Sequence, residues 1–274
     1  MRLAATRLLL LAGILGVSAV SAVAEVTLDA GYTVSIANIP IGKVEAKSRF
    51  TSNGYAAVIK GSVTGISRLI SDGRATLVGS GRISGTHVSP ASFTLQTIES
   101  SLETYVRMSM RGDRITDLFA VPRLKQAADR VPITVADTEN VLDPVAAFLV
   151  VSQKPGIADG PRICDRTINV FDGWQRFDVH LFYKETKLIT GVGGAYDGRV
   201  VVCTARYIPI AGHRTSHESV KFMEQNKRIE IAYAPLGKLP YLVPHRILIG
   251  TKFGDLIVTS NRFIVTEETG APGN

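Results

Sequence analysis

The chain has 274 residues, with 31 Lys and Arg against 24 Asp and Glu, a formal net charge of +7 and 45% hydrophobic residues. This length is enough for one sizeable core, and short runs of Val, Ile, Thr, Tyr and Phe with many glycines predict a mainly β fold in a single domain. The basic residues are scattered among these runs, so they indicate mild attraction to anionic surfaces and no nucleic-acid partner.

The first 24 residues predict a secretory signal peptide. Arg2 and Arg7 precede an apolar run, and the small-residue motif Ala22-Val23-Ala24 ends it before Glu25. The alternative is a retained membrane anchor, for which the apolar run is short. Cleavage after residue 24 would remove the two arginines and lower the net charge from +7 to +5. We expect an exported, periplasmic protein.

Residues 25–274 predict one β-rich domain, with residues 265–274 as a polar, mobile tail. Strand-like runs follow one another at short intervals, and a curled sheet of consecutive antiparallel strands leaves one concave apolar face. Turns between the runs are predicted around Pro40 and Gly42, at Asn53-Gly54, at Ser71-Asp72-Gly73-Arg74, at Arg111-Gly112-Asp113 and at Phe253-Gly254.

One apolar helix of about ten residues is predicted to begin at Asp143. Asp143 is a suitable N-cap, Pro144 suits the first helical position, and Val145, Phe148 and Leu149 fall on one stripe. A helix that is apolar all round tends to be buried. We therefore expect a curved sheet or open barrel wrapped around this helix, which either fills the core or acts as a movable lid over a ligand.

Residues 162–212 hold both cysteines and two Asp-Gly turns. Asp172-Gly173 and Asp197-Gly198 lie between strand-like runs, which predicts a meander. In an oxidising compartment two cysteines usually pair, so we predict a Cys164–Cys203 disulfide. The chain-entropy estimate for such a bridge is roughly 3–4 kcal/mol.

Several short segments resemble a family of uncharacterised exported proteins of Gram-negative bacteria, a domain-of-unknown-function family. These segments are 70–74 (ISDGR), 143–147 (DPVAA), 172–173 with 176–178 (DG and RFD), 203–207 (CTARY) and 209–213 (PIAGH). The resemblance implies a periplasmic location and a curved β-sheet around a helix. That shape is similar to the half-barrels of periplasmic lipoprotein carriers, which hold acyl chains in an apolar concavity. The family supplies no catalytic residues to carry over.

Motifs for chemistry are sparse. The sequence has no G-x-S-x-G elbow and no phosphate-binding loop, so no cofactor is predicted. His213, His217 and Glu218 have a spacing that would suit a metal on a helix, but a solvated loop is the preferred interpretation and no metal site is predicted.

Carboxylates near the meander offer a second chemical hypothesis. Asp172, Asp178 and Asp197 could supply the acid pair of a glycosidase. Two of the three belong to Asp-Gly turns, which already explains their presence. We therefore predict no catalytic residues.

The sequence thus favours a non-enzymatic envelope protein that binds a lipid or another apolar ligand. Expected partners are such a ligand or an envelope protein, with peripheral contact to the membrane. The residues predicted to line the ligand site are Phe148, Leu149, Trp174, Phe177, Tyr183 and Tyr207. The alternatives are a structural scaffold with a filled interior, and a cell-wall glycan hydrolase that uses Asp178 or His213.

Overall fold

The computed structural model describes residues 25–268 except 66, 68–70, 101 and 156–159. The predicted signal peptide and residues 269–274 lie outside the described residues.

The described chain forms a 14-stranded antiparallel sheet with the order β7-β6-β5-β4-β3-β2-β1-β14-β13-β12-β11-β10-β9, and β8 pairs with β13. The strands are β1 Glu25–Ile36, β2 Ile39–Thr51, β3 Gly54–Val63, β4 Arg74–Ser84, β5 His87–Glu99, β6 Leu102–Arg111, β7 Arg114–Val121, β8 Val150–Val151, β9 Arg166–Phe171, β10 Arg176–Ile189, β11 Gly198–Ala211, β12 Ile229–Pro235, β13 Tyr241–Thr251 and β14 Gly254–Glu268. The predicted mainly β fold with a single curved sheet is confirmed.

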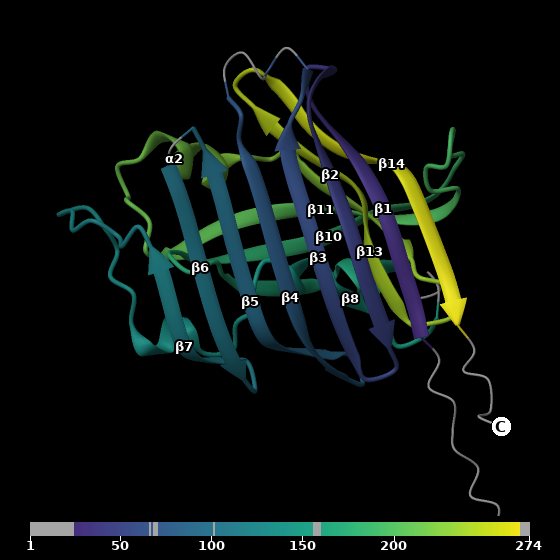
Figure 1. Cartoon of the computed structure of the whole chain (residues 1–274), viewed down its shortest axis with the longest axis horizontal. Coiled ribbons are helices and arrows are strands. Elements are labelled where there is room, and N and C mark those ends of the chain that lie inside the picture. Colours follow the sequence, from purple (N-terminus) through teal and green to yellow (C-terminus); the bar gives the residue numbers. More distant parts are fainter. Residues whose placement is uncertain (1–24, 66, 68–70, 101, 156–159, 269–274) are drawn as a thin grey trace, which may run out of the picture.

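The first and last strands join the two halves of the sheet. β1 pairs with β14 along its length, for example Leu28 opposite Val265. The sheet curls so that β1–β7 form one layer and β9–β13 pass behind it (Figure 1). β14 continues to Glu268, so residues 265–268, which we expected in the tail, pair with β1.

The two edge strands, β7 and β9, are not paired with each other, so the sheet is not closed. The segment that connects the halves runs between these edges. Glu139 bridges to Arg114 at the start of β7, and Leu142 bridges to Val170 on β9. The connecting segment thus lies along the gap between β7 and β9. Side chains from both layers of the curled sheet fill the interior behind it.

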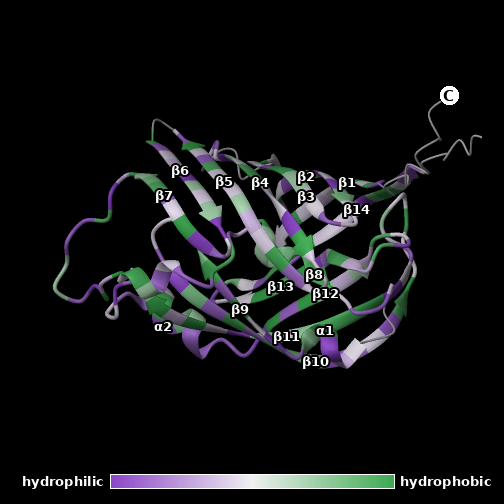
Figure 2. Cartoon of the chain, turned by 90° about the horizontal axis from the view of Figure 1, so that it is seen from below, coloured by the Kyte–Doolittle hydropathy of each residue, from purple (hydrophilic) through white to green (hydrophobic). Residues whose placement is uncertain are grey.

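Alternation along the strands builds that interior. Hydrophobic and hydrophilic bands alternate along the strands in Figure 2. On β2 and β3 exposed residues alternate with buried or half-buried ones, and Ala46, Phe50, Tyr55 and Ala57 are buried, as expected where one face of a strand meets the core.

The predicted helix at Asp143 is wrong. Only residues 146–148 form a helical turn, the three-residue 3-10 helix η3 (Ala146–Phe148), after which Val150 and Val151 form β8 against Leu242 and Tyr241. Asp143 does cap the turn, because its Oδ1 accepts hydrogen bonds from the backbone N–H groups of residues 145 and 146. β-branched residues favour an extended chain, and pairing with β13 overrides the helical pattern.

The described helices are short. They are η2 Val135–Thr138, η3, α1 Gly160–Cys164 and α2 Glu218–Gln225. None of the helices in the described part of the chain has the length and hydropathy to span a bilayer.

The predicted disulfide is present. Cys164 at the end of α1 and Cys203 on β11 are bonded, with 5.4 Å between their Cα atoms and a sequence separation of 39. Both cysteines are fully buried within a cluster that includes Ile163, Leu181 and Ile231. The bridge therefore fixes α1 against the second layer of the sheet.

Most predicted turns lie where expected, and one does not. Hairpins turn at Asn53, at Gly112-Asp113 and at Phe253, and Asp172-Gly173 joins β9 to β10. The first hairpin, however, turns at Ala37-Asn38, both with positive φ, and Pro40 lies inside β2 at a register shift. Asn adopts positive φ readily, and Pro is tolerated at such an irregularity.

Candidate functional site

An apolar cavity of about 310 Å³ lies inside the curled sheet. Strands β1–β4 form one wall, β13 and β14 form another, and the turn around η3 covers one side. The lining residues are almost all hydrophobic: Leu28, Tyr32, Val44, Ala46, Ser48, Phe50, Tyr55, Ala57, Ile59, Leu77, Val145, Phe148, Leu149, Val243, Pro244, Arg246, Ile247 and Val258.

The cavity exists because small residues occupy inward positions of adjacent strands. Ala46 on β2 and Ala57 on β3 face inward between larger neighbours, and Gly79 on β4 pairs with Ala57. A Cβ on Gly79 would lie 2.7 Å from the Cβ of Val145, so this glycine lets the η3 turn lie close against the sheet. Small side chains in the wall and a turn held above it leave space that no side chain fills.

One side of the cavity is fixed by a hydrogen bond across the interior. The Tyr32 hydroxyl on β1 donates to the Pro244 carbonyl on β13, with an O···O distance of 2.9 Å. Burial raises the pKa of Tyr32, so this phenol stays protonated and keeps its donor. The bond holds the β1 and β13 walls at a set separation.

Two polar groups lie unsatisfied at the other side. Asp143 is fully buried, and while its Oδ1 caps the η3 turn, its Oδ2 has no partner among the described residues. Tyr55 borders the cavity, and its hydroxyl, which is buried beside Gly81 on β4, likewise has no partner in the described structure. Burial raises the pKa of Asp143 to about 6, and burial followed by the charge of Asp143 raises the pKa of Tyr55.

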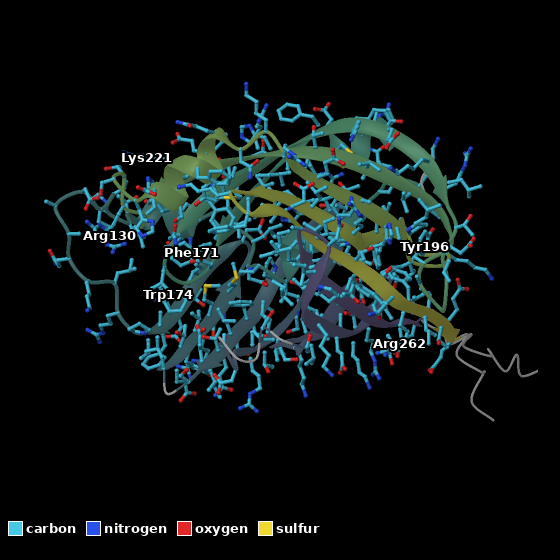
Figure 3. All side chains as sticks on the ribbon, turned by 90° about the horizontal axis from the view of Figure 1, so that it is seen from above. Arg130, Phe171, Trp174, Tyr196, Lys221 and Arg262 are labelled. Carbon is cyan, nitrogen blue, oxygen red and sulfur yellow. A yellow bond between two sulfur atoms is a disulfide. The ribbon has the colours of Figure 1, made fainter. Side chains whose placement is uncertain are left out.

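Of the six residues predicted to line a ligand site, Phe148 and Leu149 border this cavity. Trp174 lies elsewhere, where its Nε1–H donates to the Pro122 carbonyl at 2.8 Å. Figure 3 shows Trp174 beside Phe171, at the opposite end of the molecule from Tyr196.

The other three predicted residues do not border this cavity. The rings of Phe177 and Tyr207 pack on each other with centroids 5.3 Å apart, against the cluster around the disulfide. Tyr183 is exposed, and its hydroxyl lies 3.1 Å from Thr186 Oγ1. Tyr32, Ala46, Tyr55 and Ala57 also border the cavity and were not predicted, although alternation along β2 and β3 indicates the inward positions of the last three.

The two histidines considered for a metal site, His213 and His217, lie in different environments. His213, predicted in a solvated loop, is buried, because the strand-like segment at Val131 pairs with it and Gly212. The Nδ1 atom of His217 lies 2.8 Å from the Oγ atom of Ser219, within hydrogen-bond distance. No group of three or more His, Cys, Asp or Glu side chains in the described ranges is placed to hold a metal ion.

The carboxylates of the meander have structural partners. Asp178 forms an ion pair with the buried Arg176 at 2.5 Å. Asp172 accepts the backbone N–H groups of Trp174 and Gln175 within its turn, and burial raises its pKa. Asp197 Oδ2 accepts the N–H of Gly191. Each carboxylate stabilises its own turn or strand.

Comparison with known proteins gives a family and a similar fold. The family model described as "Protein of unknown function (DUF3108)" matches residues 31–259. A crystal structure of a beta-barrel-like protein of the domain of unknown function DUF1849 from Brucella abortus is similar, with a TM-score of 0.48 and 9% identity over 90% of this chain and 99% of that chain. No curated protein matches the chain.

Proposed function

The chain belongs to the DUF3108 family, whose description states no function, and from this premise we propose that the protein binds a lipid or another apolar ligand in the cavity between β1–β4 and β13. We further propose that it does so after export to the periplasm, in the manner of the periplasmic lipoprotein carriers, whose half-barrels are similar to the shape that the family resemblance implies. The disulfide is compatible with an oxidising compartment.

The observation that carries the proposal is the composition of the cavity wall. Ligand pockets typically have volumes of roughly 300–1,000 Å³, and they combine an apolar lining with a few polar groups. A cavity of about 310 Å³ with Phe50, Leu77 and Phe148 in its wall meets that description. Water gains few hydrogen bonds there, whereas each apolar Å² that a ligand buries contributes roughly 25 cal/mol.

The polar atoms at the cavity wall fit an amphiphile better than a pure hydrocarbon. The Tyr55 hydroxyl has no partner in the described structure and can donate to an ester or carbonyl oxygen. A buried donor without a partner costs free energy, which a ligand oxygen would recover. We therefore expect the bound molecule to carry an acyl chain with an oxygen within reach of Tyr55.

The first experiment is native mass spectrometry and lipid extraction of the protein purified from periplasm. We expect a bound lipid, and a rise in the unfolding temperature when a fatty acid is added to lipid-free protein. Absence of any bound lipid together with no thermal shift would refute the proposal, and a protein cross-linked in its place would favour an envelope scaffold.

A pair of variants on one strand locates the site. Ala57 faces the cavity, whereas the adjacent Ala56 faces outward and is exposed. Ala57→Phe should fill the cavity and weaken fatty-acid binding by tenfold or more, while Ala56→Phe should leave it unchanged. Thermal unfolding shows whether both variants fold. Equal binding by the two folded variants would place the ligand elsewhere.

A further inference from the structure

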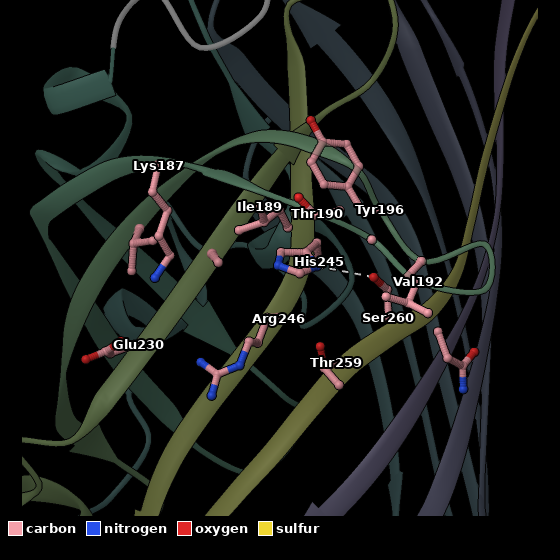
Figure 4. Close-up of a pocket in the computed structure, with 15 residues that line it drawn as sticks. Lys187, Ile189, Thr190, Val192, Tyr196, Glu230, His245, Arg246, Thr259 and Ser260 are labelled. Carbon is pink, nitrogen blue, oxygen red and sulfur yellow. Dashed lines mark hydrogen bonds between the residues drawn. The ribbon is translucent and has the colours of Figure 1, made fainter.

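A second and larger cavity of about 550 Å³ lies between the strands β10–β14 and the loop 190–197. Figure 4 shows side chains from these strands and this loop around it. The residues that matter for the argument are Lys187, Tyr196, Glu230, His245, Arg246 and Thr259.

The cavity forms where two paired strands separate. The pairing of β13 with β14 ends at Arg246 and Thr259. Beyond this point β13 follows β12, with a register shift that leaves His245 as an extra residue, while β14 follows β1. Beyond Arg246 and Thr259 the two strands are therefore not hydrogen-bonded to each other, and the fork between them can hold a ligand or be covered by a loop.

The loop 190–197 covers this fork. The Phe263 N–H donates to the Gly194 carbonyl at 2.8 Å, which fixes the loop to β14. The Tyr196 ring lies 5.8 Å from the ring of His245 and 5.1 Å from that of Phe263, between centroids. Gly193 and Gly194 have positive φ, so the loop follows a path that glycine permits. The result is a roofed cavity with an aromatic wall.

The cavity lining has more positive than negative side chains, with Lys187 and Arg246 against Glu230. The carboxylate of Glu230 is already paired with Lys184 at 2.6 Å. Lys187 is paired with Glu185, which lies outside the cavity lining. Arg246, which is half-buried, has no ion pair or side-chain hydrogen bond within the described ranges. An unpaired guanidinium in a partly enclosed site favours an anion.

The state of His245 agrees with that excess. Its Nδ1 lies 3.2 Å from Ser260 Oγ. Burial, followed by the charges of Arg246 and Lys187, lowers the pKa of His245 to about 4. The imidazole is therefore neutral at neutral pH and can form hydrogen bonds in the cavity. The positive charges of Arg246 and Lys187 both reach His245.

We propose that this cavity is a second ligand site, which takes a small organic anion consisting of a carboxylate or phosphate group on an apolar body. Arg246 would pair with the anion, with Lys187 and the Thr259 hydroxyl beside it. The apolar body would pack against Tyr196, Val202 and Ala232, which complete the wall. This site differs from the apolar cavity proposed above in that its ligand is recognised by charge, although Arg246 borders both cavities.

Isothermal titration calorimetry of the purified protein with benzoate and phenyl phosphate tests the proposal, with benzyl alcohol as the neutral control. We expect one or both anions to bind and benzyl alcohol not to bind. Preference between the two anions distinguishes a carboxylate from a phosphate ligand. No binding of either anion, or equal binding of benzyl alcohol, would overturn the proposal.

Variants separate this site from general charge effects and from the first cavity. Arg246→Gln and Lys187→Gln should each weaken anion binding by about tenfold, equivalent to about 1.4 kcal/mol. The Lys187 variant is included because Lys187 borders only the second of these two cavities, whereas Arg246 borders both. Arg199→Gln removes the same charge from an exposed residue and should have no effect.

Ala57→Phe, which fills the apolar cavity, should leave anion binding intact. Failure of fatty-acid binding and failure of anion binding are therefore separate results. Equal weakening by Arg199→Gln and Arg246→Gln would show that only net charge matters, and that outcome would refute the site.

Discussion

Gly79 on β4 lies directly beneath Val145, so that a Cβ added to the glycine would be 2.7 Å from the Cβ of Val145. This contact joins the sheet to the η3 turn that covers the apolar cavity. The φ angle of Gly79 is not in the left-handed region, so the requirement for glycine at this position is steric.

Gly79→Ala should therefore destabilise the protein by about 1–3 kcal/mol, because the added methyl displaces the turn. Val145→Ala in the same chain should restore part of that loss, with a coupling energy of about 0.5–3 kcal/mol in a double-mutant cycle measured by urea unfolding. Gly61→Ala on β3 is the control, since its Cβ would meet nothing closer than 3.8 Å. Additive effects of the two mutations would contradict the contact.

Asp143 should make the protein less stable as the pH rises. Burial raises its pKa to about 6, whereas an unfolded aspartate has a pKa near 3.9. Between about pH 4 and 6 the folded state holds more protons, so the free energy of unfolding falls, by about 3 kcal/mol, and then stays level. Asp143→Asn keeps an acceptor for the η3 turn and removes this loss.

The measurement is the free energy of unfolding of Asp143→Asn minus that of the wild type, from urea titrations at several pH values. This difference should grow in favour of the variant from pH 4 to pH 6.5. A difference that is constant across this range would show that the carboxyl group titrates normally.

His245 should have the opposite effect in an overlapping range. Its folded pKa of about 4 lies below the value near 6.5 of an unfolded histidine. The unfolded state therefore binds more protons between these values, and the free energy of unfolding rises with pH from about 4 to 6.5. The two groups offset each other in the wild type, so single variants are needed to separate them.

NMR titration of the imidazole gives the pKa of His245 directly. Arg246→Gln should raise this pKa, because it removes a nearby positive charge, while burial keeps the value below 6.5. An unchanged pKa in Arg246→Gln would mean that the guanidinium does not act on His245.

Loss of the disulfide should lower stability substantially. A bridge with a sequence separation of 39 limits the unfolded chain, for which the chain-entropy estimate is roughly 3–4 kcal/mol. Replacing Cys164 and Cys203 together by alanine should reduce the unfolding temperature about as much as reduction of the wild type. A double variant as stable as the oxidised protein would show that burial alone holds α1 against β11.

The strands and most of the turns could be predicted because they depend on local patterns of residues, and the disulfide could be predicted because the chain has two cysteines. Alternation at Ala46, Phe50, Tyr55 and Ala57 specifies which face of β2 and β3 is buried. The pairing of Cys164 with Cys203 followed from there being two cysteines in a chain expected to be exported.

The conformation of residues 143–151 and the positions of both cavities depend on contacts between distant parts of the chain. The local pattern after Asp143 favours a helix, but Val150 and Val151 gain more by pairing with β13, a strand about 90 residues later in the sequence. Likewise, the cavity wall depends on which strands become neighbours when the sheet curls. That arrangement results from long-range pairing such as that of β1 with β14, which no periodicity within a single strand encodes.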